Sequence, residues 1–287
     1  MKYRFLRFPE GKAKAVTFSY DDGCRQDLRT AQVFDRYGLK ATFNLNSAKI
    51  AKKPGGWHIT QQEIQEHILD KGHEVAVHGE LHKAPGAVRP IDGIKDVLNC
   101  RLELEAMFGQ IIRGMAYPDS GIRVFVNQSS YEDIRRYLMD LDIVYSRTLG
   151  GDNNRFELPT DWYQWMPTAH HDNGKILDWA KEFVELDADA LYSSHRTAKL
   201  FYVWGHSFEF DRKDNWQHLD ALCQALAGKE DIWYATNMEI YEYVKAYDSL
   251  VFSADSRTVY NPTLKTVWFD DDGELYRVES GQTVVTK

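Results

Sequence analysis

Short apolar runs of β-strand character alternate with stretches of helical periodicity from the start of this chain nearly to its end. In one such stretch the apolar residues Leu28, Ala31 and Phe34 recur at helical spacing. Repeated strand–helix units place successive strands in parallel, and about seven of them favour a barrel over an open sheet. We therefore expect an α/β fold. The predicted strands cover residues 15–20, 41–45, 74–77, 111–117, 143–148, 200–204 and 232–235.

The pattern changes near Leu250, where the strand–helix alternation gives way to short strands separated by turn residues. This change predicts a main domain over residues 1–250 and a small antiparallel β appendage over residues 251–287. The appendage contains the run 267–269, which is too apolar for an isolated hairpin. We expect this strand to dock on the barrel or on a neighbouring subunit of a homo-oligomer.

Composition and charge argue against several kinds of partner. The formal net charge of −8 disfavours nucleic acid and anionic membranes, since both reward basic surfaces. The sequence contains no run of 18 apolar residues that would predict a transmembrane helix. The three cysteines form no Cys-x-x-Cys pair, so we expect neither a disulfide framework nor a cysteine zinc site. The N-terminus lacks the apolar stretch of a secretory signal, which predicts a cytoplasmic location.

Two segments supply ligands that suit a mononuclear hydrolytic metal site. His78 and His82 are four residues apart, so one helical turn or a tight loop can aim both imidazoles at one cation. Asp22 completes a set of two histidines and one carboxylate that leaves a position open for water. The neighbouring Asp21 can take a proton from that water. Taken alone, Asp-Asp-Gly is also an ordinary turn, and His-x-x-x-His is a frequent coincidence.

The places of these residues along the predicted strands favour a shared site. Asp21 and Asp22 follow the first strand, His78 follows the third, Tyr117 follows the fourth, and His206 follows a late strand. The carboxyl ends of parallel strands meet at one edge, where functional groups collect. We therefore expect these side chains to lie together at one rim of the barrel.

Several residues near the late strands have two interpretations. His206 can protonate a leaving amine or alkoxide, because a histidine pKa lies near working pH; alternatively, it is a buried histidine bonded to the backbone. Trp162 and Trp204 can form a wall on which a sugar stacks, although tryptophan side chains usually belong to the core. His170 and His171 lie in a polar stretch and are more often loop residues than catalytic ones.

These residues resemble the motifs of the polysaccharide deacetylase family, the fourth carbohydrate esterase family, which is built on the NodB homology domain. The family's first motif, Thr-Phe-Asp-Asp-Gly, corresponds to residues 17–23, with two residues inserted before the carboxylates. The second, His-(Ser/Thr)-x-x-His, corresponds to residues 78–82, with glycine at the hydroxyl position. The late Leu-x-His motif corresponds to residues 204–206. The resemblance extends over residues 12–245.

Two further family motifs match more loosely. Arg-x-Pro-(Tyr/Phe) corresponds to residues 113–118, which makes Arg113 the candidate for the arginine that orients the base. The nearest match to the fourth motif, which carries an Asp and a Trp, is Asp161 with Trp162.

The resemblance implies a distorted (β/α) barrel and metal-dependent removal of acyl groups, usually N-acetyl from amino sugars. We expect Zn²⁺ as the cation, with Co²⁺ as an alternative. The predicted metal ligands are Asp22, His78 and His82. The predicted catalytic residues are Asp21, His206 and Arg113. The predicted substrate-binding residues are Tyr117, Trp204 and Trp162, and we expect a backbone N–H near Tyr117 to hold the oxyanion together with the metal.

Two other functions remain open from the sequence. An amidohydrolase of the same fold could act on a small non-sugar amide or a formamide, which the missing secretion signal favours because long polysaccharides lie outside the cell. A carbohydrate-binding protein could retain the metal without turnover. Asp21 and His206 speak against that reading, since binding needs neither a base nor an acid. The expected substrate is thus an acetylated carbohydrate or a small amide.

Overall fold

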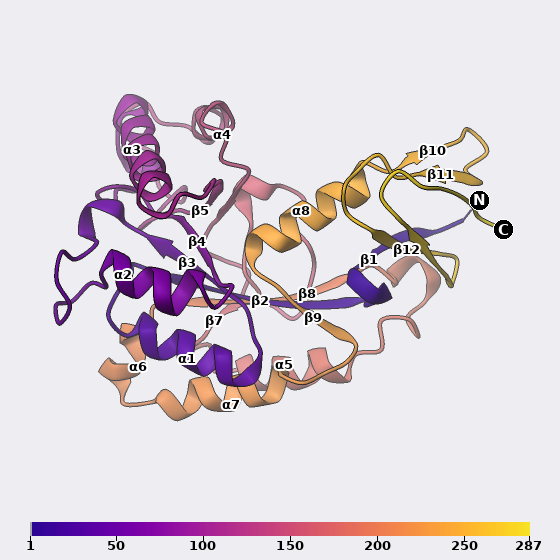
Figure 1. Ribbon diagram of the computed structural model, residues 1–287, viewed down its shortest axis with the longest axis horizontal. Coiled ribbons are helices and arrows are strands. Elements are labelled where there is room, and N and C mark those ends of the chain that lie inside the picture. The colour runs from indigo at the N-terminus through magenta and orange to yellow at the C-terminus, as the bar shows by residue number, and fades with distance from the viewer. Residues whose placement is uncertain (1) are drawn as a thin grey trace.

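The computed structural model describes residues 2–287 and centres on one curled parallel sheet (Figure 1). The strands of this sheet are β2 (Lys14–Asp21), β3 (Ala41–Leu45), β4 (Glu74–Val77), β5 (Gly114–Ala116), β6 (Tyr145–Arg147), β7 (Ala169–His170), β8 (Lys199–Gly205) and β9 (Ile232–Tyr234). They pair in the order β6-β5-β4-β3-β2-β8-β7, and β9 pairs with the first residues of β2. With helices packed around it, this sheet forms the predicted distorted (β/α) barrel.

Helices pack on the sheet in several groups. They are α1 (Asp27–Tyr37), α2 (Gln61–Ile64), α3 (Pro90–Phe108), α4 (Tyr131–Asp140), α5 (Ile176–Glu185), α6 (Phe208–Lys213), α7 (Trp216–Leu226) and α8 (Asn237–Asp248). In Figure 1, α1, α5 and α7 lie along one side of β2 and β8, and α8 lies on the opposite side. Thr60 and Thr236 begin α2 and α8 in capping boxes with Glu63 and Glu239, as their spacing predicts. No helix within residues 2–287 is both long and apolar enough to cross a membrane.

The central strand β2 has one apolar face, which packs on α1, and one face with polar side chains. Its residues are buried along the whole strand, and Phe18 packs against Phe34 of α1 with ring centroids 4.6 Å apart. On the opposite face, Ser19 Oγ accepts a hydrogen bond from Asn44 Nδ2 of β3 at 2.7 Å. Side chains alternate along a strand, so Asp21 continues the polar row of Ser19. The strand thus delivers a carboxylate to its carboxyl end from a fixed, buried position.

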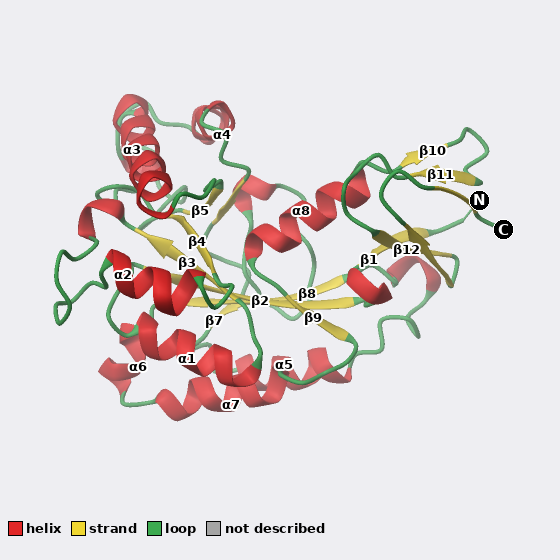
Figure 2. Cartoon of the chain, in the orientation of Figure 1, coloured by secondary structure: helices red, strands yellow, loops and turns green. Residues whose placement is uncertain are grey.

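Two small antiparallel sheets lie at one end of the molecule, where both termini are found (Figure 2). Their strands are β1 (Arg4–Arg7), β10 (Val251–Phe252), β11 (Thr258–Tyr260), β12 (Val267–Asp271), β13 (Glu274–Val278) and β14 (Thr283–Val285). The strand orders are β10-β11-β14 and β1-β12-β13. In the second sheet Arg4 pairs with Asp271 and Arg7 pairs with Trp268. The C-terminal strands therefore share a sheet with the N-terminus.

The apolar run 267–269 docks on α8 of the same chain. Val267 and Phe269 are fully buried in a cluster that includes Ala246 and Leu250, at the end of that helix. The backbone N–H of Trp268 donates a hydrogen bond to the hydroxyl of Tyr243 in α8 at 3.0 Å. This packing corresponds to the first of the two docking modes expected from the sequence.

Deletion of residues 251–287 is expected to lower the thermal stability of the protein without removing metal binding. The deletion takes away Val267, Phe269 and Val278, which are each 0% exposed. Burial of such a side chain stabilises a protein by about 1.5–3 kcal/mol, so the free energy of unfolding should fall by at least about 4 kcal/mol. Thermal unfolding and elemental analysis of the truncated protein measure the two effects. Loss of metal from a folded truncated protein would show that the C-terminal strands belong to the site.

Candidate active site

The carboxyl end of β2 turns sharply at Asp22 and Gly23. Their φ angles are 81° and 63°, in the left-handed region that glycine adopts freely and that aspartate tolerates better than most residues. The Asp22 backbone N–H donates to the carbonyl of Asn44 at 3.1 Å. Asp21 is 2% exposed, and its Oδ1 accepts a hydrogen bond from Asn44 Nδ2 at 2.8 Å. The neighbouring strand β3 therefore fixes the turn and the buried carboxylate together.

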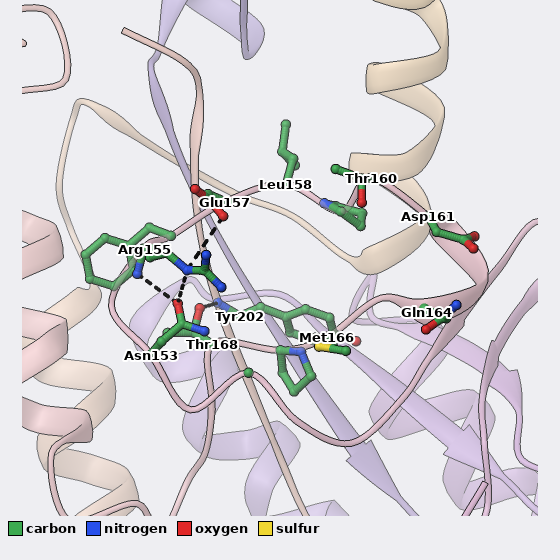
Figure 3. Close-up of a pocket in the computed structure, with 14 residues that line it drawn as sticks. Asn153, Arg155, Glu157, Leu158, Thr160, Asp161, Gln164, Met166, Thr168 and Tyr202 are labelled. Carbon is green, nitrogen blue, oxygen red and sulfur yellow. Dashed lines mark hydrogen bonds and ion pairs between the residues drawn. The ribbon is translucent and has the colours of Figure 1, made fainter. Parts of the chain in front are cut away.

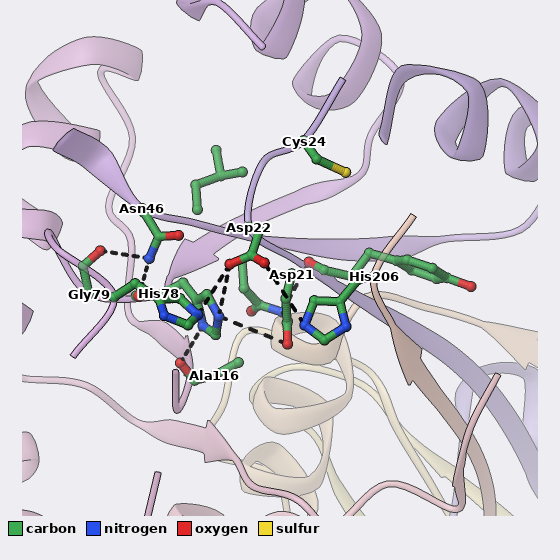
Figure 4. A network of polar contacts seen from close by, with 12 residues as sticks. Asp21, Asp22, Cys24, Asn46, His78, Gly79, Ala116 and His206 are labelled. Carbon is green, nitrogen blue, oxygen red and sulfur yellow. Dashed lines mark hydrogen bonds and ion pairs between the residues drawn. The ribbon is translucent and has the colours of Figure 1, made fainter. Parts of the chain in front are cut away.

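Asp22, His78 and His82 converge on one point at this rim. Asp22 Oδ1 lies 3.2 Å from His82 Nε2 and 3.8 Å from His78 Nε2, and all three ligand atoms lie within 4.8 Å of one another. Figure 4 shows Asp22 facing His78, with Asp21 and His206 beside them. Two atoms that bind Zn²⁺ tetrahedrally at about 2.0 Å are roughly 3.3 Å apart. The spacing of the three side chains is therefore suitable for one divalent cation.

A tight loop, rather than a helical turn, aims the two histidines. Gly79 and His82 have φ angles of 74° and 61°, so the chain after β4 bends back on itself. His78 Nδ1 donates to the carbonyl of Ala116 at 2.9 Å, which leaves Nε2 free to bind a cation. Burial lowers the pKa of His78 to about 4, so its imidazole is neutral at pH 7. The loop thus presents one neutral, oriented imidazole and a second one next to it.

Arg147, not Arg113, contacts the candidate base. Arg147 follows from β6 and donates from its guanidinium to Asp21 Oδ2, and both side chains are almost fully buried. Burial raises the pKa of Asp21, but the charges of Arg147 and His78 outweigh it and hold the pKa below its ordinary value. Arg113 instead pairs with the exposed Asp142 at 2.7 Å. The prediction for Arg113 is wrong because this residue precedes β5 and lies at the amino end of the strand, away from the rim.

His206 follows β8 and faces the metal ligands. Its Nε2 lies 4.0 Å from Asp22 Oδ2, and its Nδ1 lies 3.7 Å from Glu209 Oε1. Burial lowers the pKa of His206, but the carboxylates of Glu209 and Asp21 more than offset this, so the pKa lies above its ordinary value. The two carboxylates therefore favour the protonated form of this imidazole. Glu209 was not predicted, although it stands only three residues after His206.

Tyr117 and Trp162 do not lie as predicted for substrate binding. Tyr117 follows β5 but is 2% exposed, and its N–H donates to the carbonyl of Arg147 at 3.0 Å. That N–H is therefore engaged and does not serve an oxyanion. Trp162 packs edge-on against Trp165, with ring centroids 4.9 Å apart, and against Tyr241 of α8 at 5.0 Å. Its place is in the core between the sheet and α8.

Other aromatic side chains border the site. Trp204 lies at the site: the guanidinium of Arg147, which contacts Asp21, lies over its ring, 4.5 Å from the centroid. Phe208 lies 5.2 Å from His206 and 5.5 Å from Trp57, measured between ring centroids. Trp57 is 54% exposed. It belongs to none of the recognised motifs, so the sequence offered no signal for it.

A separate cavity of about 290 Å³ lies under the segment 151–168 (Figure 3). Its described lining includes Arg155, Asp161 and Tyr202 but none of the three candidate metal ligands. Asp161 Oδ1 accepts the backbone N–H of Tyr163 at 2.9 Å, which caps a short 3₁₀ helix. The nearest sequence match to the fourth family motif therefore has a structural role here.

Asp27 is a buried carboxyl at the start of α1. The residue is 0% exposed, and Cys24 Sγ donates a weak hydrogen bond to its Oδ1 at 3.5 Å. Burial raises the pKa of Asp27 to about 7, with further contributions from the charges of Asp22 and Asp21. The native protein thus retains a proton that the unfolded chain releases near pH 4. This group therefore makes folding less favourable as the pH rises from about 4 to 7.

Asp27→Asn is expected to stabilise the protein at pH 8 and to have little effect at pH 4. The amide avoids ionising a buried group, and a shift of about three pKa units sets an upper limit of roughly 4 kcal/mol on the gain. Urea unfolding of the metal-free wild type and variant at both pH values measures the difference. An equal difference at pH 4 and pH 8 would contradict the assigned protonation of Asp27.

Known proteins resemble this chain in sequence and in fold. Residues 9–135 match the model of the polysaccharide deacetylase family. A candidate polysaccharide deacetylase from Mycobacterium smegmatis has a similar structure, with a TM-score of 0.58 and 17% identity over 86% of this chain and 96% of that chain. The Xyl-CE4 domain of a multidomain xylanase from the hindgut metagenome of Trinervitermes trinervoides has a TM-score of 0.51 and 15% identity, over 81% of this chain and 92% of that chain. No curated protein matches the sequence.

The family match covers the stretch that contains Asp21, Asp22, His78 and His82. At these identities the two solved structures show the fold alone, and they confirm the distorted barrel. Residues 9–135 are therefore similar to the polysaccharide deacetylase family, as their motifs indicate.

Proposed function

We propose that this protein is a metal-dependent deacetylase that hydrolyses an N-acetyl or O-acetyl group on a carbohydrate. The observation that carries the proposal is the convergence of Asp22, His78 and His82 beside the carboxylate of Asp21 and the imidazole of His206. A ligand set, a base and an acid at one rim are the parts that metal-assisted hydrolysis requires.

The three candidate ligands fit a divalent cation such as Zn²⁺ or Co²⁺. Asp22 Oδ1 is buried and has no hydrogen-bond partner among the described residues, which is costly for a carboxylate oxygen. It faces Nε2 of His78 and Nε2 of His82. The Nδ1 of His78 donates a hydrogen bond to a backbone carbonyl, which fixes the direction of its ring. When bound, the cation would polarise the acyl oxygen and lower the pKa of a water.

The residues of the chain supply the proton transfers. Asp21 is held by Arg147 and Asn44, so its carboxylate has a fixed direction and is ionised when water attacks the acyl carbon. The raised pKa of His206 favours its protonated form, and its Nε2 faces Asp22 at the same rim, so it can donate a proton to the departing nitrogen or oxygen. Asp21 and His206 therefore act as base and acid in the proposed reaction.

An exposed aromatic surface beside the rim supports a sugar substrate. Trp57 and Phe208 lie next to each other, and Phe208 contacts His206. Flat aromatic faces suit the apolar faces of sugar rings, whereas a small amide would leave this surface uncovered. The proposed substrate class is thus supported by the family match and by these two side chains.

A panel of N-acetylated and O-acetylated sugars and simple amides tests the proposal, assayed with and without a chelator. We expect acetate release from the sugars and loss of that release with the chelator. Turnover of simple amides or formamides alone would favour the amidohydrolase alternative. Sugar binding without acetate release would favour a binding protein.

A further inference from the structure

A second cluster of metal-binding side chains lies on the other side of His206. His170 and His171 come from the carboxyl end of β7, Asp172 follows them, and Glu209 comes from α6. Ligand atoms of these four residues lie within 4.8 Å of one another. None of the four belongs to the set proposed above for hydrolysis.

The separations in this cluster match the coordination shell of a metal ion. His171 Nε2 lies 3.3 Å from Asp172 Oδ2 and 3.2 Å from Glu209 Oε2. Ligand atoms in a tetrahedral shell with bonds of about 2.0 Å are roughly 3.3 Å apart. These two separations, with all the ligand atoms within 4.8 Å of one another, leave a position between the three side chains that suits one cation.

His171 gives an independent indication of a ligand. The residue is 0% exposed, and neither ring nitrogen has a hydrogen-bond partner with suitable geometry among the described residues. Its ring is held between Tyr20 and Phe210, with centroid distances of 5.7 Å and 4.3 Å. Gly205 makes room for it, since a Cβ at that position would lie 2.0 Å from His171 Nδ1. The sequence therefore keeps an unsatisfied imidazole rigidly aimed at two carboxylates.

The remaining neighbours orient the carboxylates and set the charge. His170 accepts the Asp172 backbone N–H at Nδ1, so its Nε2 carries a proton and lies 3.0 Å from Glu209 Oε2. This contact orients Glu209. Lys213 bonds to Asp172 and neutralises one of the two carboxylates. With the Asp172 carboxylate paired to Lys213, the two carboxylates together leave one net negative charge for a cation.

We propose that His171, Asp172 and Glu209 bind a second divalent cation, with His170 orienting Glu209. One imidazole and two carboxylates suit a transition-metal dication that completes its shell with water. Glu209 connects the two centres, because its Oε1 lies 3.7 Å from His206 Nδ1 while Oε2 faces the second cluster. The second cation therefore fixes the carboxylate of Glu209, which lies next to the candidate acid His206.

Zinc stoichiometry tests this site without reference to activity. Chelator-stripped full-length protein is titrated with Zn²⁺ by calorimetry, and the bound metal is counted by elemental analysis after dialysis. Wild type should bind two equivalents per chain, whereas Glu209→Gln, Asp172→Asn and His78→Ala should each bind one. Asp211→Asn is the matched control on α6 and should still bind two. Circular dichroism verifies that each variant folds. If Glu209→Gln does not fold, the number of zinc equivalents bound by Asp172→Asn decides whether the second site exists.

The outcomes separate this site from the one proposed for hydrolysis. One equivalent in wild type that is lost in His78→Ala and kept in the folded Asp172→Asn protein overturns the second site and leaves the proposed catalytic metal intact. One equivalent that is kept in His78→Ala and lost in Asp172→Asn overturns the proposed catalytic metal and supports the second site.

Discussion

Asp21→Asn is expected to lower turnover by about 10²- to 10⁴-fold while the protein keeps its metal. The amide preserves the shape of the side chain but cannot accept a proton from water. Asp21 is buried and paired with Arg147, so no solvent group replaces it readily. Acetate release and metal content, measured on the same preparation, show the two effects together.

Asp142→Asn provides a matched control for this change. It also converts an aspartate that is paired with an arginine, Arg113, but this pair lies on the exposed surface. The control should retain full activity. Equal rates for wild type and Asp21→Asn, with the metal bound, would rule out Asp21 as the base.

His78→Ala is expected to lose one equivalent of metal and all metal-dependent turnover together. His78 is the buried ligand of the three and is held by the Ala116 carbonyl, so its loss leaves Asp22 and the more exposed His82 as an incomplete set. Loss of a metal ligand has a larger effect than loss of the base, because both activation of water and polarisation of the acyl group disappear.

Elemental analysis and activity, each measured across a range of added Zn²⁺, test this expectation. His67→Ala is the control, since it removes a histidine from the helical segment Gln65–Leu69 after α2 rather than from the rim. Full metal occupancy in His78→Ala at stoichiometric Zn²⁺ would refute the ligand assignment.

The regular core of the fold can be predicted from the sequence because its strands are locally specified. The predicted strands 41–45 and 74–77 coincide with β3 and β4, which are continuous runs of strand-forming residues between turns. β7 and β1 were missed for different reasons. β7 is two residues long and exists through its pairing with β8. β1 has little local signal, and its partner β12 lies near the other end of the chain.

The rim residues could be placed from the sequence because each follows a predicted strand, and parallel strands end at one edge. The same rule favours Arg147, which is next to last in the predicted strand 143–148 and ends β6, over Arg113, which precedes β5. A loose motif match pointed to Arg113 instead. Trp57 and Glu209 could not be placed, because loop conformation and the short helix α6 determine their positions rather than any periodic pattern.

Because β1 pairs with β12, their sheet cannot form until most of the chain has been synthesised. Arg4 is translated long before Asp271, its partner in the sheet. At about 5–20 residues per second, the ribosome needs roughly 10–50 s to produce that partner. During this time β1 has no partner strand, so Leu6 and Phe8, which are buried in the folded protein, remain without part of their packing until synthesis passes residue 271.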